Sequence, residues 1–261
     1  MPARVCVLGP SGRMGRAVLE AALGRDDVRI AAAVDRPEAG GLGAEVTGGV
    51  CASADLDAGL LACDVYIDFT APAATGAVAV AAARHRRAAV IGTTGLGPAE
   101  EAAVEQLARV APIVVAANFS LGVNLVLGLV QKAARALGPA WDAEVVETHH
   151  RAKRDAPSGT ALMIARAIAD GHGVDYERVK RHTRDGDVGP RPHGEIGVSS
   201  VRGGDVIGEH TAYFFGAAER LEISHRATSR AIFAIGALRA AAWVAGQPPG
   251  RYDMLDVLGL E

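Results

Sequence analysis

Cysteine and aromatic residues are scarce in this 261-residue chain, and each shortage argues against a class of protein. The three cysteines, Cys6, Cys51 and Cys63, are an odd number at spacings that match no disulfide framework, so we expect reduced thiols and a cytoplasmic protein. Aromatic residues make up 4% of the chain and alanine about a fifth, so we expect a core of small side chains.

An excess of either charge is also missing. The 27 lysines and arginines nearly balance the 30 aspartates and glutamates, so the charge gives no reason to expect nucleic acid or an anionic membrane as a partner. No targeting segment is visible ahead of the apolar run at residues 5–8. Residues 110–131 carry no charge, but Pro112, Asn118 and Asn124 make them more typical of a strand, a loop and a helix than of a membrane span.

Lysine is rare among the basic residues. Only Lys132, Lys153 and Lys180 are lysines, and the other 24 of the 27 are arginines. Codon usage can explain the arginines, but a lysine amine can donate a proton where an arginine stays charged. A lysine in such a chain can therefore mark a site that needs a titratable cation.

Apolar runs alternate with helical periodicity over residues 1–119. We expect strands at 4–9, 28–35, 65–69, 88–92 and 112–116, with helices at 12–24, 72–86 and 98–109. Short buried strands that alternate with helices predict an α/β fold with a Rossmann-type, doubly wound parallel sheet. We therefore predict a dinucleotide-binding domain at 1–119.

The pattern changes to α+β after residue 119. We expect helices at 122–137 and 158–169, a strand at 143–150, a polar stretch at 172–194, and antiparallel strands at 195–202, 205–215 and 220–227. These elements predict a second domain at 120–228. We expect a last helix at 228–245. Residues 229–261, which comprise this helix and the tail, are predicted to return to the first domain.

A glycine-rich loop, Gly9-Pro-Ser-Gly12-Arg-Met-Gly15, separates the first strand from the first helix. Its glycines let the backbone approach a pyrophosphate at a helix N-terminus, although their spacing is looser than the usual G-x-G-x-x-G. Asp35 ends the second strand and would bind the ribose hydroxyls of NAD, whereas Arg36 could accept the 2′-phosphate of NADP. The loops at 92–95 and 116–120 follow two further strands and should face the nicotinamide half, unless they are ordinary turns.

The segment 147–160, Glu-Thr-His-His-Arg-Ala-Lys-Arg-Asp-Ala-Pro-Ser-Gly-Thr, carries the densest chemistry. His149, His150 and Lys153 lie in a loop between a strand and a helix, and two arginines already supply charge there, so Lys153 is predicted to donate a proton. Ser158 is either a plain N-cap or, with Gly159 and Thr160, part of a cradle for an anion such as a dicarboxylate. No third ligand is spaced to complete a metal site with the histidines, so we expect none.

These motifs, together with residues 65–70, 206–211 and 220–225, resemble the 4-hydroxy-tetrahydrodipicolinate reductases, the DapB-type dihydrodipicolinate reductase family. The resemblance runs nearly end to end, and the His-His-x-x-Lys-x-x-Ala-Pro-Ser-Gly-Thr segment is its most specific part. Pro10 stands where a small residue is expected and Asp35 is shorter than a glutamate; both bear on cofactor preference.

The resemblance implies a reductase of the diaminopimelate and lysine pathway. It would transfer a hydride from NADH or NADPH to C4 of a cyclic dicarboxylate, 4-hydroxy-tetrahydrodipicolinate, with loss of water. The implied proton donors are His149 and Lys153, and 120–228 would be a substrate-binding and oligomerisation domain of a homotetramer. The predicted substrate-binding residues are His150, Ser158, Gly159 and Thr160. The predicted cofactor-binding residues are Gly9, Pro10, Ser11, Gly12, Arg13, Met14, Asp35, Arg36, Gly92, Thr93, Thr94, Ala116, Ala117, Asn118 and Phe119.

Two other functions compete with this one. Tyr176 and Lys180 match the Tyr-x-x-x-Lys pair of short-chain dehydrogenases, but the glycine spacing differs and the pair follows a Gly-His-Gly break. Alternatively, the chain could be a non-catalytic NAD(P)-sensing regulator. Such a regulator would not need His149, His150 and Lys153 together, and it would usually carry a basic DNA-binding module.

Overall fold

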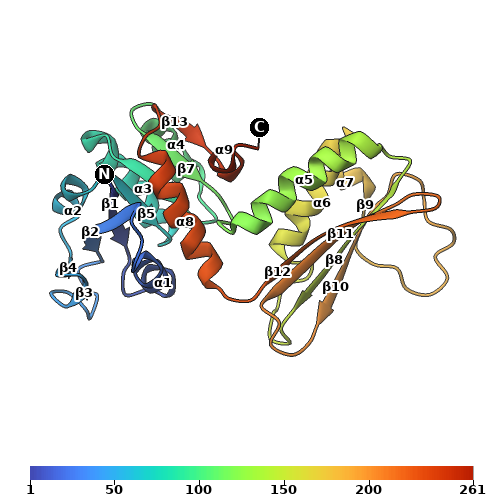
Figure 1. Ribbon diagram of the computed structural model, residues 1–261, viewed down its shortest axis with the longest axis horizontal. Helices are drawn as coiled ribbons and strands as arrows, with labels where there is room; N and C mark the ends of the chain where they lie inside the picture. The colour runs from blue at the N-terminus through green and yellow to red at the C-terminus, as the bar shows by residue number, and fades with distance from the viewer. Residues whose placement is uncertain (261) are drawn as a thin grey trace. The chain divides into compact units, whose positions relative to one another are not determined.

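The computed structural model describes residues 1–260 and separates the chain into two compact units (Figure 1). Residues 1–121 and the described part of 231–261 form the first unit, and residues 122–230 form the second. The C-terminal helix α8 (Ala231–Val244) therefore belongs to the same unit as the N-terminal strands. Each unit has its own buried core and is described by itself below.

The first unit is built on an eight-stranded sheet in the order β13-β7-β6-β5-β1-β2-β4-β3. All neighbouring pairs are parallel except β3 with β4. The central strands follow the order typical of dinucleotide-binding folds, so the predicted Rossmann-type sheet is confirmed. The strands are β1 (Ala3–Leu8), β2 (Val28–Val34), β3 (Glu45–Thr47), β4 (Val50–Ser53), β5 (Val65–Asp68), β6 (Ala88–Ile91), β7 (Pro112–Val115) and β13 (Gly250–Tyr252).

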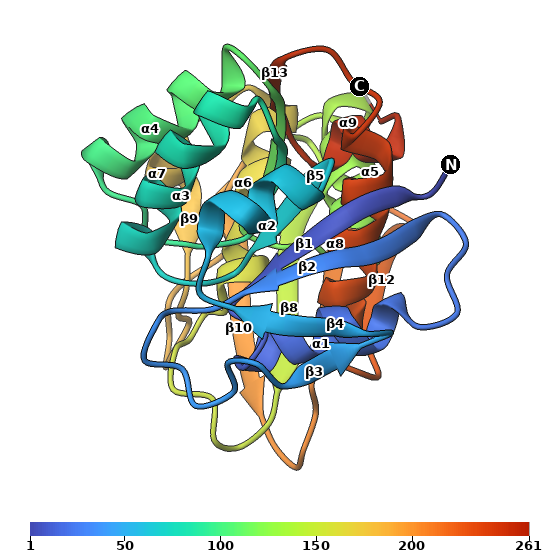
Figure 2. The ribbon, with the colours of Figure 1, turned by 90° about the vertical axis from the view of Figure 1, so that its left-hand side faces the viewer.

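Helices cover both faces of this sheet (Figure 2). Successive residues of β1 face opposite sides, so Val5 and Val7 pack in one core cluster while Cys6 and Leu8 pack in the other. Helices α1 (Arg13–Ala22), α8 and α9 (Met254–Leu258) contribute to the first cluster, and helices α2 (Leu56–Ala62), α3 (Pro72–His85) and α4 (Pro98–Ala108) contribute to the second. This two-sided burial explains why the strands read as continuous apolar runs.

The second unit has a five-stranded sheet in the order β12-β11-β8-β10-β9. Its strands are β8 (Asp142–His149), β9 (Lys180–Arg181), β10 (Ile196–Arg202), β11 (Gly208–Phe215) and β12 (Arg220–Ala227). β11 is antiparallel to β8 and β12 as expected, but β10 runs parallel to β8, so the prediction of purely antiparallel strands is wrong. The chain between β8 and β10 contains α6 (Gly159–His172) and α7 (Tyr176–Val179), and a helical crossover of that length permits parallel pairing.

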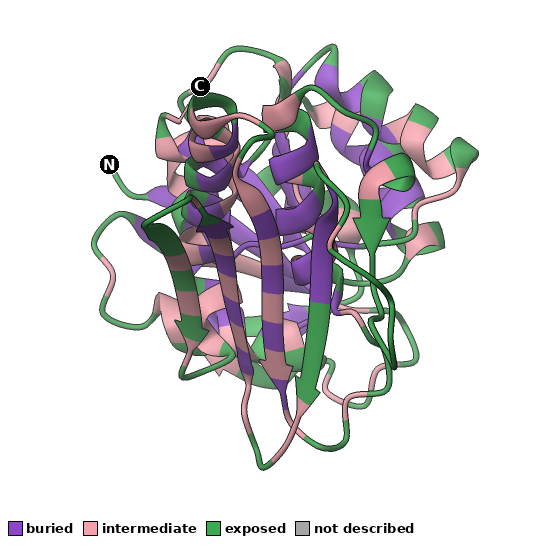
Figure 3. Cartoon of the chain, turned by 90° about the vertical axis from the view of Figure 1, so that its right-hand side faces the viewer, coloured by how far each residue is buried: buried purple, intermediate pink, exposed green. Residues whose placement is uncertain are grey.

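One face of this sheet is covered and the other is open within the chain. Helices α5 (Leu121–Leu137) and α6 pack on the covered face, against alternate residues of β8, β10 and β11. The intervening residues of β8 and β11 are only half-buried, which gives the strands their alternating colour in Figure 3. The sheet therefore keeps a face that the described chain does not cover.

Within residues 1–260, no helix is both long enough and apolar enough to cross a membrane. The uncharged stretch at 110–131 is divided between β7, a short turn and the first part of α5. The predicted strand, loop and helix are therefore the elements found there.

Candidate active site

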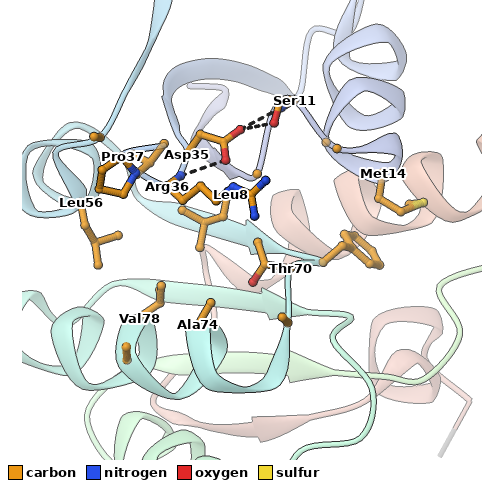
Figure 4. Close-up of a pocket in the computed structure, with 18 of the residues that line it drawn as sticks. Leu8, Ser11, Met14, Asp35, Arg36, Pro37, Leu56, Thr70, Ala74 and Val78 are labelled. Atoms are coloured by element: carbon orange, nitrogen blue, oxygen red, sulfur yellow. Dashed lines mark hydrogen bonds between the residues drawn. The ribbon is translucent and has the colours of Figure 1, made fainter. Parts of the chain in front are cut away.

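A cavity of about 730 Å³ opens in the first unit at the carboxyl ends of β1, β2 and β5 (Figure 4). The chain runs from β1 outward to β2 on one side and later returns to place β5 on the other, so the cavity lies where the strand order reverses. Ligands of open parallel sheets bind at this position. Seven predicted cofactor-binding residues line the cavity: Gly9, Ser11, Gly12, Arg13, Met14, Asp35 and Arg36.

The glycine loop is tightly folded over the start of α1. A Cβ added at Gly15 would lie 2.1 Å from the carbonyl oxygen of Gly9, so only glycine allows the helix to start this close to the strand. Gly12 is the N-cap of α1, and no side chain caps the helix there. The first N–H groups of α1 therefore remain available for an anion, which suits the pyrophosphate of a dinucleotide.

Asp35 is held beside the glycine loop by its neighbours. The amide and the hydroxyl of Ser11 donate to Oδ2 of Asp35 at 3.1 and 2.5 Å, and the amide of Arg36 donates to Oδ1 at 2.9 Å. Partial burial raises the pKa of Asp35, but these hydrogen bonds outweigh it and lower the pKa overall. An ionised carboxylate at the cavity wall suits a ribose diol, and the exposed side chain of Arg36 beside it suits a 2′-phosphate.

The other predicted cofactor-binding residues do not line this cavity. Pro10, Asn118 and Phe119 are buried, and the ring of Phe119 packs edge-on against Phe69 with centroids 5.4 Å apart. Asn118 Oδ1 accepts a hydrogen bond from the amide of Ser120 and so shapes the turn before α5. The remaining ones are Gly92, Thr93, Thr94, Ala116 and Ala117, which follow β6 and β7.

Sequence reasoning missed the cavity residues that follow β5. Phe69, Thr70 and Ala71 line the cavity because β5 lies beside β1, on the opposite side from β2. Asp68, which is fully buried, holds this turn: its Oδ1 accepts hydrogen bonds from the amide and hydroxyl of Thr70 at 2.8 and 2.6 Å and from the hydroxyl of Thr93 at 3.3 Å. The rule that ligands bind where the strand order reverses could have identified these residues.

In the second unit, the histidine loop follows the end of β8. His149 is the last residue of β8 and is buried, whereas His150 and Lys153 are half-buried. The amide of His150 donates to the carbonyl of Val206 at 2.7 Å, and the amide of Gly203 donates to the carbonyl of His149 at 3.0 Å. The loop between β10 and β11 thus fixes the backbone that carries the predicted proton donors.

Glu147 lies on the covered face of β8, two residues before His149, and is fully buried. Arg202 donates one hydrogen bond to each of its carboxylate oxygens, both at 2.8 Å, and the amide of Ser158 donates at 3.1 Å. His149 Nδ1 lies 2.5 Å from Oε2. Burial alone would raise the pKa of Glu147, but its hydrogen bonds, led by Arg202, lower it to about 2.

His149 has a pKa below its ordinary value. Burial lowers this pKa most, the hydrogen bond to Glu147 raises it, and the positive charges of Lys153 and Arg202 lower it further. His210 on β11 meets the His149 ring edge-on with centroids 5.2 Å apart, and burial lowers the pKa of His210 to about 4. His210 is therefore neutral near pH 7.

Ser158 is the N-cap of α6, and both of its polar groups are engaged. Its Oγ accepts from the amide of Ala161 at 3.2 Å and lies 3.1 Å from Nε2 of His210, while its amide donates to Glu147. Gly159 is exposed at the first position of the helix, and Thr160 follows it. Lys153 Nζ lies 2.9 Å from Oδ2 of Asp155. Ser158, Gly159 and Thr160 thus form the start of α6, and the N-terminus of a helix favours an anion.

The Tyr176 and Lys180 side chains are engaged separately. The hydroxyl of Tyr176 lies 2.8 Å from Nε2 of His182, and the amine of Lys180 pairs with Glu177. Tyr176 starts the four-residue helix α7, not the long core helix that a Tyr-x-x-x-Lys pair requires. Within residues 1–260, no group of three His, Cys, Asp or Glu side chains is arranged to hold a metal ion.

Family models match both parts of the chain. Residues 3–119 match the model described as dihydrodipicolinate reductase, N-terminus, and residues 122–258 match dihydrodipicolinate reductase, C-terminus. A protein named 4-hydroxy-tetrahydrodipicolinate reductase from Alkalilimnicola ehrlichii is 50% identical, and the match covers 100% of both chains. A protein of the same name from Acinetobacter baumannii is 47% identical over 98% of this chain and 96% of its own.

Solved structures show the same fold. The structure described as dipicolinate-bound dihydrodipicolinate reductase from Paenisporosarcina sp. TG-14 has a TM-score of 0.79 at 23% sequence identity, covering 98% of this chain and 99% of that one. A probable dehydrogenase from Thermotoga maritima has a TM-score of 0.63 at 13% identity, covering 98% of this chain and 93% of that one. At these identities the likeness concerns the fold.

Proposed function

The chain belongs to the dihydrodipicolinate reductase family, and we propose that it reduces 4-hydroxy-tetrahydrodipicolinate to tetrahydrodipicolinate with NADH or NADPH. This reaction is a step of diaminopimelate and lysine synthesis. The observation that carries the proposal is the end of β8 and the loop that leads from it to α6, where His149 and Lys153 are near enough for the charge of Lys153 to lower the pKa of His149. A regulator that only senses the cofactor would not need these two side chains, so we favour an enzymatic function over a sensing one.

The residues of the first unit fit a nicotinamide dinucleotide. When bound, that cofactor supplies the hydride that is added to C4 of the substrate ring. The uncapped start of α1 would hold its pyrophosphate, and Asp35 with Arg36 would hold the adenosine ribose. Because Asp35 and Arg36 both lie at the cavity, we propose that the chain accepts both NADH and NADPH.

The residues of the second unit would bind the dicarboxylate and supply protons. Gly159, Thr160 and the first turn of α6 would hold one carboxylate, with His150 and Lys153 contributing polar contacts. Loss of water from the substrate leaves an unsaturated ring, and a proton must be added to the carbon beside the one that receives the hydride. We assign this proton transfer to His149 and Lys153. A positioned acid of this kind accelerates a reaction roughly 10²- to 10⁴-fold.

We also propose a homotetramer that forms through the open face of the second unit's sheet. Tyr213 and Phe215 stack on that face with ring centroids 5.7 Å apart, and Val201 on β10 is 48% exposed. Apolar groups at an uncovered sheet face favour burial against another copy. Light scattering in solution should give four times the 26.8 kDa of one chain, and a monomer would contradict the proposal. The three free cysteines suit a reducing compartment, so we place the enzyme in the cytoplasm.

Initial rates with each reduced cofactor and freshly generated 4-hydroxy-tetrahydrodipicolinate test the activity directly. We expect oxidation of NADH or NADPH that depends on the dicarboxylate. If neither cofactor is consumed, the proposed reaction is wrong. A chain that binds the cofactor without consuming it would instead be a sensor.

A further inference from the structure

Glu147 is a buried carboxylate to which the proposed reaction assigns no task. It is fully buried and is held by Arg202 from β10 and by the amide of Ser158. Removing two opposite charges from water is costly, and an apolar residue would fill the same space without that cost. We therefore expect the Glu147–Arg202 pair to have a role besides packing.

The ionisation of Glu147 decides where His149 carries its proton. An ionised carboxylate can only accept hydrogen bonds, and the two N–H groups of Arg202 keep this one ionised. Since Oε2 of Glu147 lies 2.5 Å from Nδ1 of His149, Nδ1 must be the donor. Nδ1 is then protonated in both the neutral and the charged ring, and only Nε2 is left to gain or lose a proton.

The second unit also fixes the ring at its other side. Gly208 begins β11 beside Nε2 of His149, and a Cβ at that position would lie 2.9 Å from this nitrogen. His210 meets the ring edge-on from the same strand and is neutral, because burial lowers its pKa to about 4. Of the two ring nitrogens, Nδ1 thus meets a carboxylate and Nε2 meets a residue without a side chain.

We infer that Glu147, held by Arg202, is a positioning residue that keeps the proton of neutral His149 on Nδ1 and makes Nε2 the nitrogen that exchanges a proton with the substrate. The inference rests on the proposed function only for the identity of that substrate. The charged and titratable groups that face His149 are Glu147 on β8, Arg202 on β10, His210 on β11 and Lys153 in the loop.

The tautomer can be measured in the wild-type chain without any substrate. Long-range ¹H–¹⁵N spectra of ¹⁵N-histidine-labelled protein distinguish the two neutral tautomers, and the signals of His149 are those that disappear in His149→Gln. We expect the Nδ1–H tautomer at neutral pH. If wild-type His149 is an Nε2–H tautomer or an even mixture, the inference is wrong, whatever the activity.

Glu147→Gln should reverse the tautomer. One carboxylate oxygen accepts from Arg202 and the Ser158 amide, and the other accepts from Arg202 and His149. The hydroxyl of Ser200 also hydrogen-bonds to Glu147, but it can donate or accept and so does not decide the orientation of a glutamine. The NH₂ of a glutamine can only donate, and the Ser158 amide cannot become an acceptor, whereas His149 can. We therefore expect the NH₂ to face His149 and to move its proton to Nε2.

The same variant should lose turnover but keep substrate binding. With the proton on the wrong nitrogen, we expect kcat to fall between about 10²- and 10⁴-fold. KM should change less than about threefold, because Glu147 is buried behind His149. Glu147→Asp keeps an anionic acceptor, so it should restore the Nδ1–H tautomer and part of kcat. If Glu147 served packing alone, the shorter aspartate would not restore either.

Asp57→Asn is the matched control. Asp57 on α2 contacts Nε2 of His85 at 2.6 Å, so the control breaks a second carboxylate–histidine contact at an exposed position outside both candidate sites, and it should leave kcat unchanged. A Glu147→Gln variant that keeps the Nδ1–H tautomer and wild-type kcat overturns the inference. If that variant does not fold, the tautomer of His149 in the wild-type chain still tests the inference. A wild-type chain with the expected tautomer but no reductase activity would refute the proposed function alone.

Discussion

The amide of Ser158 donates a hydrogen bond to the buried carboxylate of Glu147 at 3.1 Å, which ties the start of α6 to the end of β8. This bond joins the two ends of the segment 148–157, which contains the last two residues of β8 and the loop that follows. Arg202 strengthens the closure, because the nitrogen that bonds Oε1 of Glu147 also donates to the carbonyl of Asp155 at 2.7 Å. The segment that carries the predicted proton donors is thus held through its backbone, so we expect the half-buried side chain of Lys153 to tolerate a substitution that keeps its charge without unfolding the segment.

Replacing Lys153 by arginine therefore tests chemistry and not folding. Arginine keeps the positive charge and the pairing with Asp155, but it stays protonated and cannot donate a proton. We expect kcat to fall roughly 10²-fold or more while KM for the dicarboxylate stays close to wild type. Lys132→Arg, at an exposed position of α5, is the matched control and should have no effect. Wild-type kcat in Lys153→Arg would remove Lys153 from the list of proton donors.

The chemistry of the site was predictable where one local segment carries it. His149, His150 and Lys153 are within five positions of each other, and the glycine loop and Asp35 each follow a strand of the predicted parallel sheet. Glu147 and Arg202 were not recognised, because they meet only when β10 pairs with β8. A sequence shows that both residues are charged, but the pairing of distant strands decides that they are buried together.

The parallel sheet of the first unit was predictable because its strands are buried on both faces. The β3–β4 pair, α2, β13 and α9 were not predicted, because their sequences lack a distinct periodicity. The pairing of β10 was predicted wrongly, because alternating burial is the same in parallel and antiparallel strands. Only the helical crossover between β8 and β10 indicates the parallel pairing, and sequence periodicity does not give a strand's partner.

Binding of a dicarboxylate should be accompanied by proton uptake. In the free chain burial holds the pKa of His149 below its ordinary value and so favours the neutral ring, with Nε2 unprotonated. A bound dianion favours the charged ring and raises this pKa, so a proton is taken up at any pH between the free and bound values. Calorimetry with pyridine-2,6-dicarboxylate at pH 7 in buffers of different ionisation enthalpy measures this uptake. It should vanish in His149→Gln, and no uptake in the wild-type chain would contradict the assignment.

Cofactor preference should depend on Asp35 and Arg36 in opposite directions. Asp35→Asn removes the carboxylate that we propose binds the ribose hydroxyls and that would repel a 2′-phosphate, whereas Arg36 remains to attract that phosphate. We expect the ratio of kcat/KM for NADPH to that for NADH to rise about tenfold, which corresponds to about 1.4 kcal/mol. Arg36→Ala should lower the same ratio. If neither variant changes this ratio, the adenosine ribose does not bind beside Asp35 and Arg36 as we propose.

A methyl group at position 208 should disturb the reaction by displacing His149. In Gly208→Ala the new Cβ would lie 2.9 Å from Nε2, and the ring cannot easily turn away because Glu147 holds Nδ1. We expect kcat to fall between about 10- and 10²-fold, since a misplacement of about 1 Å has that effect on a catalytic group. Gly203→Ala is the matched control, because a Cβ there meets no atom within 4 Å and its amide still donates to the carbonyl of His149. Equal kcat values in the two variants would show that Nε2 of His149 does not need the space that Gly208 provides.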